Sequence, residues 1–341
     1  MSNLSVNTIT DALGGSTASI NGLTPQASNM QPFNRIINGA MTIDQRNAGA
    51  TLSLATTATT LYAVDRFFAY QDKTGVTGTV GQSTDAPAGF KNSFGVTITT
   101  GSTSGAADQS FIAHHIEGLN VLDLGFGTAN AQTITLSFWV KSSITGTNGF
   151  SVGNSAGNRC YVGSYTVNSA NTWEQKTVTI AGDTSGTWLT TNGIGVRIRF
   201  NIGSGSNWFG AAGSWGTFYK GPTGSFSTTA TSGATFYITG VQLEAGSTAS
   251  SFAHENYADT LSKCQRYYEM VITGEIPEGG NYYASWRYLT PSRFSVTKRA
   301  NPTLVVTSQA GWPNGGGGTY SITGDTQQAS IIGQSGNALN N

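Results

Sequence analysis

Aromatic side chains in glycine-rich surroundings are the part of this sequence with the clearest chemical meaning. Trp208 and Trp215 lie in one such stretch, and Trp312 adjoins four consecutive glycines at 315–318. Aromatic faces stack on the C–H surfaces of sugars, while arginine and amide groups supply hydrogen bonds. The pattern predicts contact with a carbohydrate, and packing in a core or between subunits is the alternative for most of these rings. The predicted contact residues are Tyr283, Trp286, Arg287, Tyr288 and Trp312.

Three short patterns match catalytic or metal-binding signatures, but each lacks its required context. Gly153–Gly157 fits the G-x-S-x-G nucleophile elbow, which is a strand-to-helix turn, whereas a β-type run follows here. Ser295–Lys298 fits S-x-x-K without the partner motifs. His114 and His115 are adjacent, so on a strand they point to opposite faces and cannot hold one metal ion together. The 17 acidic residues are scattered, and glycoside hydrolysis needs a pair of carboxyl groups. We therefore predict no catalytic residue and no metal site.

Composition excludes several classes of protein. Charged residues make up 10% of the 341 residues and the formal net charge is zero, whereas about 25% is usual. Lys and Arg do not cluster as they do in nucleic-acid binders. No apolar run reaches the roughly 18 residues of a membrane span, and the N-terminus has no signal-peptide pattern. Cys160 and Cys264 form neither a disulfide framework nor a zinc motif, although they could pair once. The sequence predicts no nucleic-acid partner and no membrane insertion.

Short alternating runs separated by Gly, Ser and Asn recur from about residue 33 to 255 and predict a β-sandwich or a β-barrel. In the run 133–141, every second residue is apolar, and Trp139 falls on the other face. The run 195–202 likewise places Arg197 and Arg199 on its polar face. These three side chains are expected to line one sheet-face groove or to pack against a neighbouring subunit. Gly240 is expected to mark a β-bulge.

The two ends of the chain have a different character. Residues 1–32 alternate too weakly to fold alone and are predicted to be an arm that needs a partner, with a frayed terminus as the alternative. The spacing of Leu261, Cys264 and Tyr268 predicts one helix over 257–270 with Asn256 as its N-cap. Strand-like runs follow. We therefore expect three parts: the arm 1–32, a sandwich domain 33–255, and a small C-terminal domain 256–341.

Seven segments, in order along the chain, resemble tail fibre proteins of tailed bacteriophages. The segments are Phe33–Gly49, Tyr62–Phe67, Leu136–Ser142, Asn171–Glu174, Ile238–Gly246, Cys264–Glu269 and Phe294–Thr303. The sandwich also resembles jelly-roll carbohydrate-binding modules. The resemblance implies an all-β protein: a jelly-roll sandwich with an N-terminal attachment arm and a small, mainly β C-terminal tip domain joined through one short helix. In such modules a structural calcium ion is frequent, and no other cofactor is expected.

The resemblance also implies a biological setting. It implies a homotrimer in the virion tail, assembled in the host cytoplasm with its cysteines as free thiols. The arm would attach it to other tail or baseplate proteins. The C-terminal domain would adsorb the virion to a host surface polysaccharide or lipopolysaccharide by non-catalytic, multivalent binding. The alternatives are a tailspike-like polysaccharide depolymerase, a structural virion fibre or adaptor without receptor contact, and a secreted carbohydrate-binding module.

Overall fold

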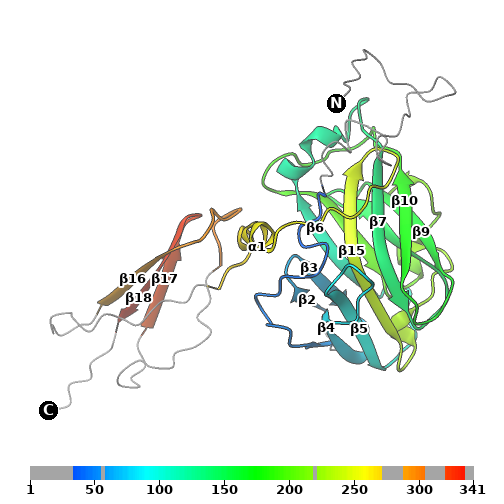
Figure 1. The fold of residues 1–341 in the computed structure, drawn as a ribbon, viewed down its shortest axis with the longest axis horizontal. Helices are drawn as coiled ribbons and strands as arrows, with labels where there is room; N and C mark the ends of the chain where they lie inside the picture. The colour runs from blue at the N-terminus through cyan, green and yellow to red at the C-terminus, as the bar shows by residue number, and fades with distance from the viewer. Residues whose placement is uncertain (1–33, 55–57, 218–220, 271–286, 304–318, 335–341) are drawn as a thin grey trace, which may run out of the picture.

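Two antiparallel β-sheets face each other and enclose one large hydrophobic core, which makes the protein a jelly-roll β-sandwich (Figure 1). The computed structural model describes residues 34–54, 58–217, 221–270, 287–303 and 319–334. The six-stranded sheet contains, in spatial order, β1 (Leu52–Leu54), β4 (Thr77–Ser83), β5 (Ser93–Thr100), β15 (Thr235–Ala245), β7 (Ile134–Ser142) and β10 (Glu174–Ile180). The seven-stranded sheet contains β13 (Trp215–Gly216), β9 (Cys160–Val167), β8 (Gly146–Gly153), β11 (Ile194–Asn201), β6 (Ser110–Glu117), β3 (Phe67–Gln71) and β2 (Thr59–Val64).

The remaining elements are short or lie beyond the sandwich. Strands β12 (Phe209–Gly210) and β14 (Gly221–Pro222) pair in parallel. The connections that the structure describes include the 3₁₀ helices η1 (Gly118–Asn120), η2 (Leu122–Leu124), η3 (Ser206–Trp208) and η4 (Thr228–Ala230). After the sandwich come helix α1 (Tyr257–Gln265) and an antiparallel sheet of β16 (Arg287–Arg293), β18 (Gln328–Gln334) and β17 (Thr319–Gly324). Figure 1 shows α1 between the sandwich and this smaller sheet. In the described part of the chain, no helix combines the length and the apolar character needed to cross a membrane.

The alternation predicted from the sequence is the alternation that builds the core. Phe138 of β7 and Phe200 of β11 are fully buried, and their rings meet edge to face with centroids 5.0 Å apart. Phe150 of β8 packs on both. Gly163 of β9 makes this packing possible, because a Cβ atom there would lie 2.1 Å from Cζ of Phe150. The predicted bulge is also present, since the pairing of β15 with β7 shifts register around Gly240.

Helix α1 is confirmed, with the predicted cap, although it is shorter than the pattern indicated. The Asn256 side chain accepts a hydrogen bond from the backbone N–H of Ala258, as an N-cap residue does. Inside the helix, Cys264 is buried against Ile37 and Ile43 of the segment that enters the sandwich. The helix ends at Gln265 rather than near residue 270, because the next side chains turn back to the sandwich, as described below. The boundaries 1–32, 33–255 and 256–341 stay predictions, and the arm lies outside the described residues.

Candidate functional site

The outer face of the seven-stranded sheet carries aromatic rings across neighbouring strands. Along β6 the side chains alternate, so Ile112 and Ile116 enter the core while Phe111 and Ala113 face outward. On the outer face, Tyr70 of β3 stacks on Phe111 with a centroid distance of 5.2 Å and 19° between the ring planes. An antiparallel sheet normally presents polar side chains to solvent on its outer face. This sheet therefore departs from the expected pattern over β3 and β6.

The rings continue in both directions across the sheet. Phe68 packs edge to face on Phe111 at 6.4 Å, and Tyr62 of β2 lies 5.2 Å from Phe68. On the other side, Cζ of Arg199 from β11 lies 4.3 Å above the Phe111 ring. We call the set consisting of Tyr62, Phe68, Tyr70, Phe111, Arg199 and Trp208 the aromatic face. Phe68 and Phe111 are buried beneath the surrounding side chains. The solvent-accessible surface of the aromatic face is therefore formed by its partly exposed members, which are Tyr62, Tyr70, Arg199 and Trp208.

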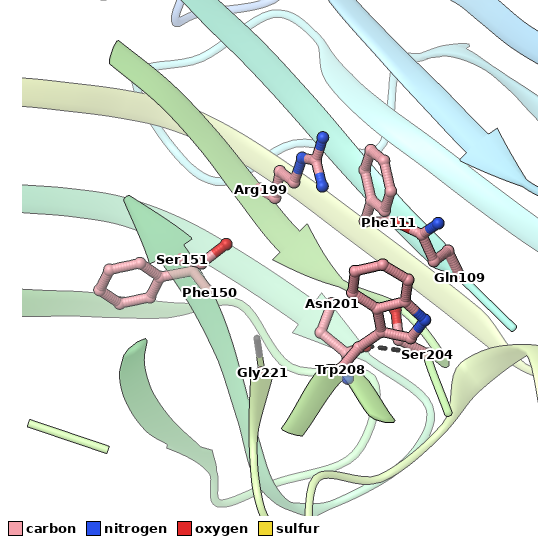
Figure 2. Close-up of a pocket in the computed structure, with 9 residues that line it drawn as sticks. All are labelled: Gln109, Phe111, Phe150, Ser151, Arg199, Asn201, Ser204, Trp208 and Gly221. Atoms are coloured by element: carbon pink, nitrogen blue, oxygen red, sulfur yellow. Dashed lines mark hydrogen bonds between the residues drawn. The ribbon is translucent and has the colours of Figure 1, made fainter. Parts of the chain in front are cut away.

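A shallow hollow lies at one end of the aromatic face, where η3 approaches β6 and β11. Figure 2 shows Trp208, Phe111 and Arg199 gathered around the hollow, with the Gln109 amide beside them and Phe150 pointing away. The lining also includes the hydroxyl of Ser151, which the register places opposite Arg199. Its polar groups are thus guanidinium, amide and hydroxyl, and no Asp or Glu is among the residues that line it.

The position of Trp208 is fixed by hydrogen bonds between two loops. Its indole N–H donates to the carbonyl of Ala107 at 2.7 Å, and the backbone N–H of Asn207 donates to Ala106 at 2.9 Å. The loops can approach only because residue 205 is glycine: a Cβ atom there would lie 1.9 Å from the carbonyl oxygen of Gly105. Since its N–H is already satisfied, Trp208 offers a ring face rather than a hydrogen-bond donor to a ligand.

A larger cleft, of about 770 Å³, lies at the other end of the aromatic face, beneath the residues that follow α1. We call it the junction cleft. Its floor includes Tyr62, Phe68 and His115 from the sheet. Tyr267, Tyr268 and Arg299 contribute from the segments beyond the sandwich. The cleft therefore joins the sandwich to the chain beyond α1 and continues the aromatic face.

A buried carboxylate holds this junction together. Glu117 at the end of β6 accepts hydrogen bonds from Arg266 Nε at 2.9 Å, from Arg266 Nη2 at 2.6 Å and from the Tyr267 hydroxyl at 2.5 Å. Its side chain is 1% exposed. Burial by itself would raise the pKa of Glu117, but the hydrogen bonds from Arg266 and Tyr267 outweigh burial and lower the pKa. Because both side chains reach back to Glu117, the chain leaves the helical path after Gln265.

The two adjacent histidines behave as the strand geometry predicted. His114 faces the core, where its Nε2 lies 3.2 Å from the carbonyl oxygen of Ile37, and His115 faces outward in the junction cleft. Burial, together with the neighbouring Arg197 and Arg199, lowers the pKa of His115 to about 3. The ring of His115 is therefore neutral near pH 7. Its Nε2 atom is buried and has no hydrogen-bond partner.

The catalytic-looking motifs have structural roles. Gly153–Gly157 forms the turn between β8 and β9, so it is not a strand-to-helix elbow. Ser295 and Lys298 both bind Glu269, which fastens their segment to the residues after α1. Across the described residues, no three His, Cys, Asp or Glu side chains come together as metal ligands. The part of the chain that the structure describes thus provides no such cluster for the calcium ion that the resemblance implies.

The expectation that Trp139 shares one surface with Arg197 and Arg199 is wrong. Trp139 belongs to β7 of the six-stranded sheet and both arginines belong to β11 of the seven-stranded sheet, so they lie on opposite outer faces of the sandwich. Both runs alternate as predicted, but alternation cannot say which sheet a strand joins. Trp139 also lies beside Phe90 at Gly240, where a Cβ atom would contact both rings.

The predicted contact residues near the C-terminus are not tested by the structure. Arg287 and Tyr288 lie in β16, opposite Gln334 and Gly333 of β18. Tyr283, Trp286 and Trp312 lie outside the described residues. The sequence argument did single out Trp208, but it missed Tyr62, Phe68, Tyr70 and Phe111. The alternation of Phe111 and Ala113 with Ile112 and His114 was the available signal, since it makes both faces of β6 apolar or aromatic.

No protein-family model and no curated protein matches this sequence. One similar solved structure is the enzymatically active domain of tailspike protein 4 of bacteriophage CBA120, at 15% identity and a TM-score of 0.32. That match covers 62% of this chain and 21% of the tailspike chain, so this chain spans about a fifth of the tailspike's length. A family 11 carbohydrate-binding module of a Clostridium thermocellum cellulosomal cellulase matches at 12% identity and a TM-score of 0.28, over 59% of this chain and 97% of the module. Each is a similarity at the level of the fold.

Proposed function

We propose that this protein binds a glycan, without cleaving it, on the aromatic face of its seven-stranded sheet. The observation that carries the proposal is the row of contacting aromatic rings, bordered by Arg199, Gln109 and Ser151, on a sheet face that would ordinarily be polar. Aromatic rings match the C–H faces of a pyranose, and guanidinium, amide and hydroxyl groups match its hydroxyls. A row of rings along a sheet suits an extended oligosaccharide rather than a single sugar.

The lining of the hollow supports binding rather than hydrolysis. Glycosidases of the two-carboxylate type place an acid and a second carboxylate on either side of the scissile bond. The residues lining the hollow in Figure 2 include neither Asp nor Glu. In the junction cleft, Glu117 is held by Arg266 and Tyr267, and Asp65 accepts hydrogen bonds from Gln45. Both of these carboxylates are thus committed to structural contacts.

We propose further that the glycan lies on a host cell surface and that the protein is a homotrimeric fibre of a phage virion. The support is the sequence resemblance, together with the positions of its segments. Phe33–Gly49, Tyr62–Phe67, Cys264–Glu269 and Phe294–Thr303 contribute residues to the contacts around the junction cleft. In this proposal residues 1–32 attach the fibre to other tail or baseplate proteins. Three copies make weak individual contacts effective through avidity.

The test is binding to arrayed bacterial surface polysaccharides and lipopolysaccharides, followed by titration of the best ligand. Tyr70→Ala and Trp208→Ala should each weaken binding at least tenfold, because each removes a stacking surface. Trp139→Ala, on the opposite face of the sandwich, is the matched control and should leave the affinity unchanged. If Trp286→Ala and Trp312→Ala abolish binding while Tyr70→Ala does not, contact lies in the C-terminal domain and the proposed surface is wrong.

Two further measurements address activity and assembly. Release of oligosaccharides from the bound polysaccharide would favour the depolymerase alternative over non-catalytic binding. The native mass, measured by light scattering after size exclusion, should be three times that of one chain. The mass of a single chain would contradict the trimeric fibre and favour an isolated carbohydrate-binding module. Failure to bind any cell surface, together with a place on the virion, would favour the structural fibre or adaptor.

A further inference from the structure

The junction cleft contains more positive charge than its own acidic groups neutralise. Three arginines, Arg46, Arg66 and Arg299, line it together with two acids, Asp65 and Glu117. The Asp65 carboxylate accepts a hydrogen bond from Gln45 and lies 3.8 Å from Arg46. Glu117 is paired with Arg266 from outside the cleft lining. The arginines left over are Arg66 and Arg299.

Arg66 is partly buried in a place where its conformation and the loss of hydration cost free energy. It sits at the turn between β2 and β3 with a φ of 71°, and such left-handed backbone is strained for a residue other than glycine. Its guanidinium lies 3.5 Å above the Tyr267 ring and donates to the carbonyl oxygen of His115. Its Nε atom is buried and finds no hydrogen-bond partner among the described residues. Within the described residues, no carboxylate forms an ion pair with Arg66.

Other positively charged side chains lie near Arg66 and His115. Arg299 lines the cleft and is held through hydrogen bonds with the backbone and side chain of Asn192. Arg197 of β11 lies directly across the strand pair from His115. Burial lowers the pKa of Arg66, and the charge of Arg299 lowers it further, whereas Tyr267 opposes this shift. Arg66 and Arg299 both line the junction cleft, so an anion bound there would be attracted by two like charges.

We propose that the junction cleft binds the anionic substituent of an acidic glycan, a carboxylate or phosphate group, through Arg66 and Arg299. The inference rests on the proposed function and specifies its ligand. Arginine is suited to both anions because its planar guanidinium donates two parallel hydrogen bonds. Tyr62 and Phe68 belong to both the cleft and the aromatic face, so the sugar ring that carries the anion can stack beside it.

The test compares a carboxylated oligosaccharide with its neutral homologue and adds a sugar phosphate as the second kind of anion. Oligogalacturonate, its carboxyl-reduced neutral homologue and mannose 6-phosphate are titrated into the full-length protein by calorimetry at low and at moderate salt. We expect one of the two anions to bind at least tenfold more tightly than the neutral oligosaccharide, and the preference to shrink as salt rises. Arg299→Gln should remove the preference. Lys176→Gln, on the six-stranded sheet, is the control that should keep it. Arg66→Gln is the second variant, with circular dichroism to establish that it folds.

The outcomes separate this inference from the proposed function. Tighter binding of oligogalacturonate assigns the anion to a sugar carboxylate, and tighter binding of mannose 6-phosphate assigns it to phosphate. Equal binding of the charged and neutral ligands, or an anion preference that survives Arg299→Gln, overturns the inference. If the neutral oligosaccharide binds and Tyr70→Ala weakens it, the glycan-binding proposal stands without the anion site. If no arrayed glycan binds, both proposals fail.

Discussion

Removing the Glu117 carboxylate tests the structure of the junction most directly. The carboxylate is almost fully buried and accepts three hydrogen bonds, two of them from one guanidinium group. In Glu117→Ala, Arg266 and Tyr267 lose their partner. Loss of one member of a buried ion pair costs about 3–5 kcal/mol. Because the Arg266 side chain is 32% exposed and can regain water, we expect about 3 kcal/mol, at the lower end of that range.

A double-mutant cycle separates the ion pair from the other consequences of each substitution. Glu117→Gln, Arg266→Gln and the double variant would be unfolded in urea, with tryptophan fluorescence as the signal. A buried, two-pronged pair should give a coupling free energy of about 2 kcal/mol, whereas exposed pairs give roughly 0.2–1 kcal/mol. Tyr267→Phe should cost about 1.5 kcal/mol, as expected for one hydrogen bond to a charged group.

The assay also shows which part of the chain depends on Glu117. If the contacts fasten the segment after α1, cleavage by trypsin after Arg266 should accelerate in Glu117→Gln while the sandwich remains intact. A coupling free energy below about 0.5 kcal/mol would match a solvent-exposed pair. That result would refute the buried carboxylate and the junction built on it.

Three other predictions concern Trp208, the histidine pair and the cysteines. Gly205→Ala should destabilise the protein by about 1–3 kcal/mol through overpacking and weaken glycan binding. Gly216, which has open space around it, provides the control, since Gly216→Ala should change neither stability nor binding. Equal losses of stability in the two variants would contradict the loop contact at Gly205. The pKa of His115 is about 3 in the folded protein and about 6.5 in the unfolded chain. The unfolded state therefore takes up the proton first, and the free energy of unfolding falls as the pH drops below 6.5, by about 2 kcal/mol at pH 5. Urea titrations at both pH values should show a smaller loss of stability in His115→Gln. Cys160 and Cys264 are buried free thiols, and burial raises the pKa of the Cys264 thiol. A thiol reagent should therefore label neither cysteine until the protein unfolds. Rapid labelling of the native protein would contradict their burial.

Local patterns in the sequence were sufficient to predict the type of most elements. The alternation in 133–141 and 195–202 predicted two strands of the core, Gly240 predicted a bulge, and Asn256 predicted the start of the helix. Each of these features depends on residues that are neighbours along the chain, because strand and helix periods and caps are local properties. The number and spacing of such runs indicated a sandwich or a barrel, and the jelly roll came from the resemblance to carbohydrate-binding modules.

The sequence by itself thus determined which residues face a core and which face away from it. Only the tertiary structure decided which outward-facing residues share a surface. Phe111 meets Tyr70 and Arg199 because β6 lies between β3 and β11, strands far apart in the chain, and Trp139 is separated from Arg199 because their strands belong to different sheets. The junction cleft likewise depends on Glu117 meeting Arg266, 149 positions later. Strand order is chosen by the packing of the whole core, so no local pattern can reveal these neighbours.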